Sequence, residues 1–512
     1  MKFTFGGGIN ELNDIAISPD EAISGQNFEL GLGNTKFKRR KPFDLLDTAT
    51  NTSEIHGIHQ LITRAGVKTT LVAAGTIMYS WTGSAFNNED TIDADSEFHH
   101  VAWDLDERII IVDRIKENVV LDWNGTTCAD YAHNIGGVTS FYAKYAIVQN
   151  GRLVFANITT DAVDNPHMLC FSEFENYDNL DTTTRAGDSS FTTGNEPFYI
   201  LTPDLEAING LVRFHRSTII STEGGQLFEL VGDDSTNYRF EPFYGGSGAL
   251  GTDAFVNAGN DVFYVRDGGI IESLRSTDTY GDVGTDDTSL PIRETAKAGL
   301  ADPLVVYDQA NQKILFWTGS SVLVLYKDLI NSDKSPWGIY KTEHASGFST
   351  KAVAYMELPD SATKTVLFGD DSGNIYDLNG EGLAGDGGTD SILAIRKMPL
   401  QEFDYENFLE GRVFYRRQGE CELSITFEWG DEKNTTNLLI PLKGRTGATN
   451  KNYFGGGATP IYFGDGEYFG EGDVVGNPVS GGFSAIGKGT SVFATFQLET
   501  VEEFEIDYIE TP

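Results

Sequence analysis

Residues 365–380 read TVLFGDDSGNIYDLNG and give the clearest example of a unit that recurs along the chain. Residues 366–368 and 374–378 are rich in β-formers, and the five residues between them are Gly, Asp and Ser. Two apolar segments separated by residues that tolerate positive φ predict a β-hairpin. The fold depends on whether this hairpin is repeated.

Six further hairpins of the same kind are predicted upstream. They span residues 70–83, 109–125, 151–172 (with a longer turn), 217–232, 261–274 and 314–327. Trp81 and Trp123 occupy equivalent positions 42 residues apart, and Gly225 and Gly269 are 44 apart. A β repeat of about 40–50 residues is the size of one four-stranded propeller blade. The sequence therefore predicts an all-β fold with a six- or seven-bladed β-propeller, and stacked sandwiches with coincidental spacing are the alternative.

Composition agrees with a turn-rich β protein of more than one domain. The chain has 512 residues, with 57 Gly, 33 Phe and 21 Tyr, which is too long for one small core. Its net charge is −39, from 76 acidic and 37 basic residues. A general nucleic-acid-binding surface needs a basic footprint, so the charge favours a surface that repels polyanions or a chain adapted to a saline medium.

The ends of the chain are predicted to differ from the propeller at residues 56–390. Residues 1–55 are expected to form an extended N-terminal docking arm, with a short helical turn near Pro19. We expect a β-sandwich at residues 391–512, because its apolar segments alternate as antiparallel strands do. Residues 381–390 are the predicted domain boundary, residues 281–290 a second exposed linker, and residues 161–186 contain a predicted long loop.

Two groups of residues are candidate contact sites. The arm contains a basic cluster that is unusual in so acidic a chain, with a solvated turn as the alternative reading: Lys36, Lys38, Arg39, Arg40 and Lys41. The C-terminal region contains a Gly-aromatic repeat that cannot fill a core by itself, and we expect a subunit contact there. Its aromatic residues are Tyr453, Phe454, Tyr462, Phe463, Tyr468 and Phe469.

Signatures of enzymes and metal sites are weak. Residues 246–251 satisfy G-x-G-x-x-G but open no predicted helix, so a phosphate site is rejected. His56, His59, His99 and His100 lack a matching third ligand, and loop histidines are the expected reading. The acidic turns at 286–287 and 370–371 match no defined calcium loop, and solvated turns are expected there. No catalytic residue, cofactor or metal is predicted, and the chain is expected not to be an enzyme.

The cysteines and the hydropathy of the chain indicate no disulfide framework, zinc site, signal peptide or membrane segment. Cys128, Cys170 and Cys421 are far apart and odd in number, so they indicate neither a disulfide framework nor a zinc site. The segment MKFTFGGGINELND has no apolar core of signal-peptide length. No apolar run has the length of a membrane-spanning helix. We therefore expect a protein without a membrane segment.

The order of several phrases resembles the propeller-containing tail nozzle, or packaged-DNA stabilisation (hub), proteins of short-tailed bacteriophages. The resemblance covers nearly the whole chain and depends on order, not on one strict motif. A GGxN arm precedes SGQNFEL and KRRKPF, and then come NGRLVFA, LCFSEFENYDNL, AINGLVRFHRSTIIST, GGSGALGTDAFVNAGNDVFYVRDGGI, SPWGIY and FGDDSGNIYDLN. A β-sandwich with Gly-aromatic repeats ends the chain.

This resemblance implies a structural role in the virion, after assembly in the host cytoplasm. It implies a homo-oligomer, a hexameric ring below the portal and adaptor, in contact with the adaptor ring and with other tail proteins such as a fibre or needle. The ring would retain packaged DNA and later let it pass through the lumen without specific binding. The resemblance carries over no catalytic residues, and a tail-tip hub of a longer tail is not distinguished from it.

Two other functions are considered. A propeller adhesin or lectin that binds host glycans would present exposed aromatic residues beside Asp or Asn on one face. A propeller hydrolase would need a carboxylate pair at a defined separation. Residues 371–376 are similar to the aspartate box of sialidases, but Gly369 replaces its serine and Tyr376 its tryptophan.

Overall fold

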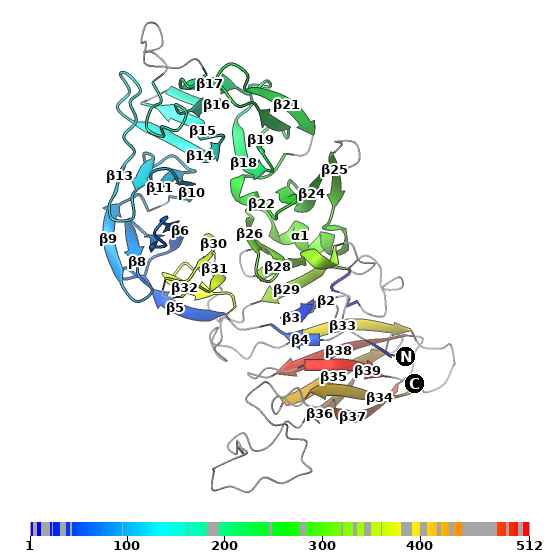
Figure 1. Ribbon diagram of the computed structural model, residues 1–512. Helices are drawn as coiled ribbons and strands as arrows, with labels where there is room; N and C mark the ends of the chain where they lie inside the picture. The colour runs from blue at the N-terminus through cyan, green and yellow to red at the C-terminus, as the bar shows by residue number, and fades with distance from the viewer. Residues whose placement is uncertain are drawn as a thin grey trace. The chain divides into compact units, whose positions relative to one another are not determined.

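A computed structural model of the chain describes the propeller almost completely and the two ends in part. It describes residues 2–3, 8–11, 21–22, 24–30, 37–40, 43–94, 96–161, 163–181, 194–244, 248–276, 283–318, 321–330, 335–341, 350–359, 361–379, 392–399, 407–416, 421–429, 435–442, 479–487, 491–499 and 505–510. Seven four-stranded antiparallel sheets follow one another and surround a common centre (Figure 1). The fold is therefore a seven-bladed β-propeller.

Blades 1 to 4 are each built from four consecutive strands. Their bounds are β6 (Ile55–Ile62), β7 (Lys68–Ala74), β8 (Ile77–Trp81) and β9 (Phe86–Thr91) in blade 1; β10 (Phe98–Trp103), β11 (Arg108–Asp113), β12 (Leu121–Trp123) and β13 (Cys128–Asp130) in blade 2; β14 (Phe141–Gln149), β15 (Arg152–Thr160), β16 (Val163–Phe171) and β17 (Phe198–Leu201) in blade 3; and β18 (Ile208–Phe214), β19 (Ser217–Thr222), β20 (Leu227–Val231) and β21 (Arg239–Tyr244) in blade 4.

Blades 5 and 6 follow the same plan, and blade 7 takes its fourth strand from the other end of the chain. The bounds are β22 (Phe255–Asn257), β23 (Asp261–Arg266), β24 (Ile270–Ser276) and β25 (Val283–Asp287) in blade 5; β26 (Leu304–Asp308), β27 (Lys313–Trp317), β28 (Ser321–Tyr326) and β29 (Trp337–Lys341) in blade 6; and β30 (Ala352–Glu357), β31 (Lys364–Gly369), β32 (Asn374–Asp377) and β5 (Asp44–Thr48) in blade 7. Short helices connect some of these strands: η1 (Thr252–Ala254), η2 (Leu290–Ile292), α1 (Arg293–Gly299) and η3 (Lys327–Leu329).

The inner strands of each blade are apolar on both faces, because each sheet lies between two others. On β11, Ile109 and Ile111 join a buried cluster with blade 1, whereas Ile110 and Val112 join one with blade 3. A strand covered on both sides reads as a continuous apolar run instead of an alternating one. The outer strand β9 (FNNEDT) is half exposed and polar. This contrast explains why the second and third strands gave the clearest signal in the sequence.

All seven predicted hairpins are present as the second and third strands of the seven blades, from β7–β8 to β31–β32. Three boundaries were predicted wrongly. The turn after β15 is short, at Asp161 with φ 47°, and β16 occupies residues 163–171, so the predicted long loop begins only at residue 172. Residues 283–287 of the predicted linker form β25. Residues 44–48, assigned to the arm, form β5 and pair with β32. The predicted linker at 381–390 lies outside the described residues.

Side-chain amides and imidazoles connect neighbouring blades through backbone carbonyls. Asn157 donates to Ile208 O at 2.8 Å between blades 3 and 4. Gln60 donates to Glu357 O at 2.7 Å between blades 1 and 7. Buried carbonyls need donors, so these side chains add directional contacts to the apolar packing between sheets.

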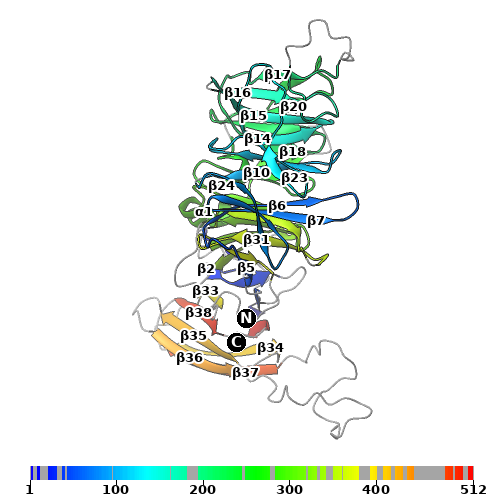
Figure 2. The same ribbon diagram turned by 90° about the vertical axis from the view of Figure 1, so that its left-hand side faces the viewer.

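The chain forms two compact units, Phe43–Ser320 with Ser346–Asn379, and Met1–Pro42 with Ser321–Ala345 and Gly380–Pro512. In the second unit the arm strands pair with the C-terminal strands (both regions are labelled in Figure 2). One sheet has the order β3-β4-β39-β34-β37 with β1 also on β39, and the other has the order β2-β33-β38-β35-β36. Their bounds are β1 (Lys2–Phe3), β2 (Ser24–Gln26), β3 (Phe28–Leu30), β4 (Phe37–Arg39), β33 (Ile392–Pro399), β34 (Asn407–Arg416), β35 (Cys421–Trp429), β36 (Thr435–Leu442), β37 (Val479–Gly487), β38 (Ser491–Glu499) and β39 (Glu505–Glu510). Face-to-face packing of the two sheets as a sandwich stays a prediction.

The arm also lies along β29 within this second unit. Gly8 N donates to Ser335 O at 2.7 Å, Ile9 N to Trp337 O at 2.8 Å, and Asn27 N to Ile339 O at 2.7 Å. A Cβ at position 8 would overlap the Trp337 carbonyl oxygen, so this close approach requires glycine. The described part of the arm is therefore fixed by backbone hydrogen bonds within its own chain.

Candidate functional site

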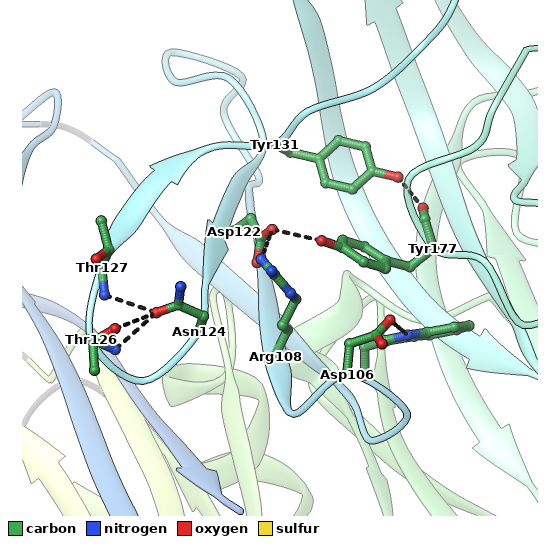
Figure 3. A network of polar contacts seen from close by, with 9 residues as sticks. Asp106, Arg108, Asp122, Asn124, Thr126, Thr127, Tyr131 and Tyr177 are labelled. Atoms are coloured by element: carbon green, nitrogen blue, oxygen red, sulfur yellow. Dashed lines mark hydrogen bonds and ion pairs between the residues drawn. The ribbon is translucent and has the colours of Figure 1, made fainter.

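A polar network joins blade 2 to the loop that follows β16 of blade 3 (Figure 3). Asp122 lies on β12 and accepts from Arg108 Nη1, on β11, at 2.6 Å and from the Tyr177 hydroxyl at 3.2 Å. The Arg108 guanidinium also lies 5.3 Å from the centre of the Tyr177 ring. Tyr131 donates to the Tyr177 carbonyl oxygen. One carboxylate thus holds a cation and a phenol from two neighbouring blades.

Burial controls the protonation of this network. It raises the pKa of Asp122, and the Arg108 guanidinium opposes that rise. Burial and the Asp122 carboxylate raise the pKa of Tyr177 to about 12, so the phenol stays a neutral donor. Asp122 Oδ1 is buried without a hydrogen-bond partner. The arrangement holds two segments together, and it places no second carboxylate in hydrogen-bond contact with the first.

Replacing Arg108 by leucine is expected to destabilise the propeller by about 2–3 kcal/mol at pH 7, because Asp122 loses its counter-ion inside the network. The loss should be smaller at pH 5. A carboxyl group whose pKa is raised in the folded state stabilises the fold more when it is protonated than when it is ionised. The destabilisation caused by an ionised Asp122 therefore grows as pH rises. Urea unfolding at both pH values measures this difference. Tyr177→Phe is the control, at about 1 kcal/mol; an equal loss at both pH values would contradict the assignment.

A second cluster lies on the first strands of blades 1 and 2 and brings together histidines that the sequence placed in loops. His59 on β6 and His100 on β10 face each other, with 2.8 Å between their Nδ1 atoms. His56 Nε2 lies 2.8 Å from Gly75 O, and its Nδ1 lies 2.5 Å from Ser96 O. The expectation of loop histidines is therefore wrong for these three residues and for His99, which is also on β10. The packing of blade 1 against blade 2 brings His59 and His100 together, and their spacing in the sequence gave no signal of it.

Neither this cluster nor another group of side chains in the described ranges has the arrangement of a metal site: no set of three or more His, Cys, Asp or Glu residues there could hold an ion. The acidic turns are occupied by the chain's own donors. Asp370 accepts from Ser372 N at 2.9 Å, from Asn374 N at 2.8 Å and from the Tyr376 hydroxyl at 3.3 Å. Asp287 accepts from Ser289 N at 3.0 Å and from its hydroxyl at 2.8 Å. Both carboxylates thus close turns.

Two further sequence-based interpretations concern glycine and cysteine. Gly248–Gly251 leads into the three-residue helix η1, too short for a phosphate-binding helix terminus, whereas residues 246 and 247 lie outside the described residues. Cys128 and Cys170 are free and buried, and burial raises the pKa of each thiol to about 12. A thiol with so high a pKa is unreactive.

The basic cluster of the arm is only partly described. Lys36 and Lys41 lie outside the described residues, and Lys38 and Arg39 are on β4. Arg40 is 2% exposed, donates from Nε to Asn27 Oδ1 at 3.0 Å, and lies 5.8 Å from the centre of the Tyr340 ring. Arg40 as a surface docking residue is thus a wrong prediction: its guanidinium contributes to the interior. The Gly-aromatic residues Tyr453 to Phe469 lie outside the described residues.

Sequence reasoning missed two features. The first is the Asp122–Arg108–Tyr177 network, although Asp122 precedes the Trp123 used to measure the repeat. The second is an ion pair at 3.0 Å between Arg114 Nη1, after β11 of blade 2, and Asp253 Oδ2, in η1 before blade 5. Blades 3 and 4 separate these residues along the chain, and no local pattern reports such a contact.

Comparisons with known proteins add no functional information. No protein-family model matches the chain, and no curated protein matches it. Among solved structures, the chain is similar to BBS1N in its complex with ARL6DN, with 9% identity over 67% of this chain and 98% of that one and a TM-score of 0.40. It is also similar to YCF48 bound to D1 peptide, with 10% identity over 66% of this chain and 95% of that one and a TM-score of 0.38. Scores this low carry no argument, so the propeller is assigned from strand pairing. Among the described residues, no helix has the length and apolar character needed to cross a membrane.

Proposed function

We propose that this chain is a structural virion protein, the tail nozzle or hub of a short-tailed bacteriophage. Its copies would form a ring below the portal and adaptor that retains packaged DNA and later provides the channel for ejection. The observation that carries the proposal is the ordered set of sequence phrases shared with that family, from the GGxN arm to FGDDSGNIYDLN.

The chemistry of the chain supports a scaffold. Several of its polar side chains connect segments of the chain: Asp122 joins blades 2 and 3, Arg114 joins blade 2 to the segment before blade 5, and Asn157 joins blades 3 and 4. The net charge of −39 suits a surface beside DNA that must move, because like charges repel phosphate and prevent adhesion.

The use of the arm supports the same proposal. Gly8, Ile9 and Asn27 hold the arm on β29 through backbone hydrogen bonds. Strands β1 and β4 pair with β39, and β2 pairs with β33. An arm tied into both of these sheets can transmit force from a docking partner to the rest of its unit.

The test is the mass of the purified full-length protein by light scattering, with negative-stain images, alone and with the candidate adaptor. We expect a six-fold ring, either alone or on the adaptor. A monomer that persists with the adaptor would overturn the proposal and would make glycan arrays the next experiment, since the adhesin alternative predicts that the monomer binds glycans.

Deleting residues 454–472 is expected to reduce ring formation at least about tenfold at a fixed protein concentration, because the Gly-aromatic repeat is the predicted subunit contact. The fraction of protein in rings by light scattering measures the effect. Deleting the predicted linker residues 382–386 serves as the control for loss of a loop. Rings that form normally without residues 454–472 would remove this segment from the interface.

A further inference from the structure

Six residues meet near the centre of the propeller and are called the axial cluster below. They come from blades 1, 2 and 5, with three imidazoles, one guanidinium and two carboxylates: His59, His99, His100, Arg114, Glu97 and Asp253.

The contact between His59 and His100 depends on protons. Two Nδ1 atoms at 2.8 Å form a hydrogen bond only when one of them donates and the other accepts. If both rings are imidazolium ions, two N–H groups point at each other and the contact is lost. The other nitrogen of His59, Nε2, is buried without a partner against the backbone of Gly57. An added proton there finds no acceptor.

Arg114 connects η1, which precedes blade 5, to the histidines of blades 1 and 2. Its guanidinium donates to Glu97 Oε2 at 2.7 Å, and its Nη1 lies 3.0 Å from Asp253 Oδ2. The Arg114 side chain is 14% exposed, so water screens these pairs weakly. Asp253 also attracts a proton to His100, whereas Arg114 repels one from His99.

Acid reverses the charge of the axial cluster. With neutral imidazoles it holds one guanidinium and two carboxylates, a net charge of −1; with three imidazolium ions it holds four cations and two carboxylates, a net charge of +2. Four cations in this small volume repel one another, and two carboxylates compensate them only in part. His56, on the same strand as His59, has carbonyl oxygens within hydrogen-bond distance of both ring nitrogens, Ser96 O and Gly75 O.

We propose that the axial cluster is an acid-operated release that separates blade 1 from blade 2 and opens the centre of the propeller. The blades keep their own strand pairing when the release operates, because the three histidines lie on the first strands β6 and β10, whereas Glu97, Arg114 and Asp253 lie outside the strands. This property is independent of the proposed virion role.

The pKa values of the three histidines determine over which pH range the closed form loses stability, and whether acid or base causes the loss. Burial lowers the pKa of His99 and of His100 to about 4, and lowers that of His59 well below its usual value. A histidine in the opened form titrates near its ordinary pKa of about 6.5. The opened form therefore binds more protons between these values, and the closed form loses stability as pH falls from about 6.5 to about 4. Above about 6.5 the closed form is fully favoured.

The experiment is an acid titration of the full-length protein from pH 7.5 to 4, followed by tryptophan fluorescence and by far-UV circular dichroism. Trp81, Trp103 and Trp123 are buried in blades 1 and 2 and report their separation. We expect a reversible fluorescence change at a pH where the β signal persists. In His100→Gln, which cannot become charged, the midpoint should move down by about 0.5 pH unit or more, since one of the coupled protons is lost.

Three comparisons make the result decisive. His167→Gln, on β16 away from the axial cluster, should keep the midpoint of the unsubstituted protein. His59→Asn repeats the test from the other strand, and thermal melts at pH 7.5 establish that each variant is folded. An unchanged midpoint in both His100→Gln and His59→Asn would overturn the proposal. An equal shift in His167→Gln would also overturn it, since histidine number and not position would then matter.

Discussion

Replacing Arg152 by methionine is expected to destabilise the propeller by about 3–5 kcal/mol, because three buried carbonyl oxygens lose a charged donor. Arg152 is fully buried at the start of β15. Its guanidinium donates to Ser172 O at 2.6 Å, to Glu196 O at 3.1 Å and to Gly194 O at 2.5 Å. It also lies 5.3 Å from the centre of the Phe198 ring. One side chain therefore holds both ends of the segment between β16 and β17.

The matched control for this substitution is Arg239→Met. Arg239 pairs with Glu241 at 2.5 Å, but its side chain is 63% exposed, and exposed pairs contribute about 0–1 kcal/mol. The urea midpoint and the slope of unfolding, measured for both variants, separate the two cases. Equal midpoints for the two variants would mean that water replaces the Arg152 hydrogen bonds without cost.

Replacing Gly369 by alanine is expected to destabilise the junction of blades 7 and 1 by about 2–4 kcal/mol through overpacking. A Cβ at this position would overlap Cβ and Cγ2 of Ile55 and would lie 3.0 Å from its Cγ1. Ile55 is fully buried at the start of β6, so it has no free space into which to move. The same overlap explains why glycine stands here where the sialidase aspartate box has serine.

Gly251→Ala is the control for this second substitution. A Cβ there meets only Asn209 O, at 3.9 Å, and its φ of 175° is extended backbone open to any residue. We expect a change in Tm of several degrees for Gly369→Ala and a change within about 2 °C for the control. Similar Tm values for the two variants would show that the β31–β6 junction relaxes around the added methyl group.

The sequence predicted the propeller because its repeat is local. The second and third strands of each blade are consecutive in the chain, so their apolar runs and the turn residues between them lie within 20 residues of one another, as in Arg152–Phe171 of blade 3. The outer strands were harder to predict. β25 (VGTDD) and β5 (DLLDT) are polar and short, and a strand with one exposed edge needs few apolar residues.

Closure of the ring was beyond local reasoning. β5 pairs with β32, with Thr48 opposite Asn374, and the Trp81 Nε1 donates to Asp47 at 2.9 Å. A strand that pairs with residues over 300 positions away has no signature except its β propensity. The sequence therefore suggested the repeat and left the number of blades at six or seven.

Polar contacts within one hairpin could be predicted from the sequence, whereas polar contacts between blades could not. The acidic turn at Asp370 is local, since its donors come from residues 372–376 of the same hairpin. The solvated turn predicted there is nevertheless wrong, because Asp370 is only 4% exposed. The pairs His59–His100 and Arg114–Asp253 join different blades. Arg40 looked like part of an exposed basic run, yet it is buried beside Asn27 and Tyr340.

The sequence by itself determined the all-β class, the repeat length, the seven hairpins and the acidic character of this protein. Each of these follows from the order of neighbouring residues and from composition. The tertiary structure decided the number of blades, the strand that closes the ring, the pairing of the arm with the C-terminal strands and the two polar clusters. The physical reason is that hairpins are stabilised by contacts between neighbouring residues of the chain, whereas closure and clustering depend on which distant segments bury each other's surfaces and satisfy each other's hydrogen bonds.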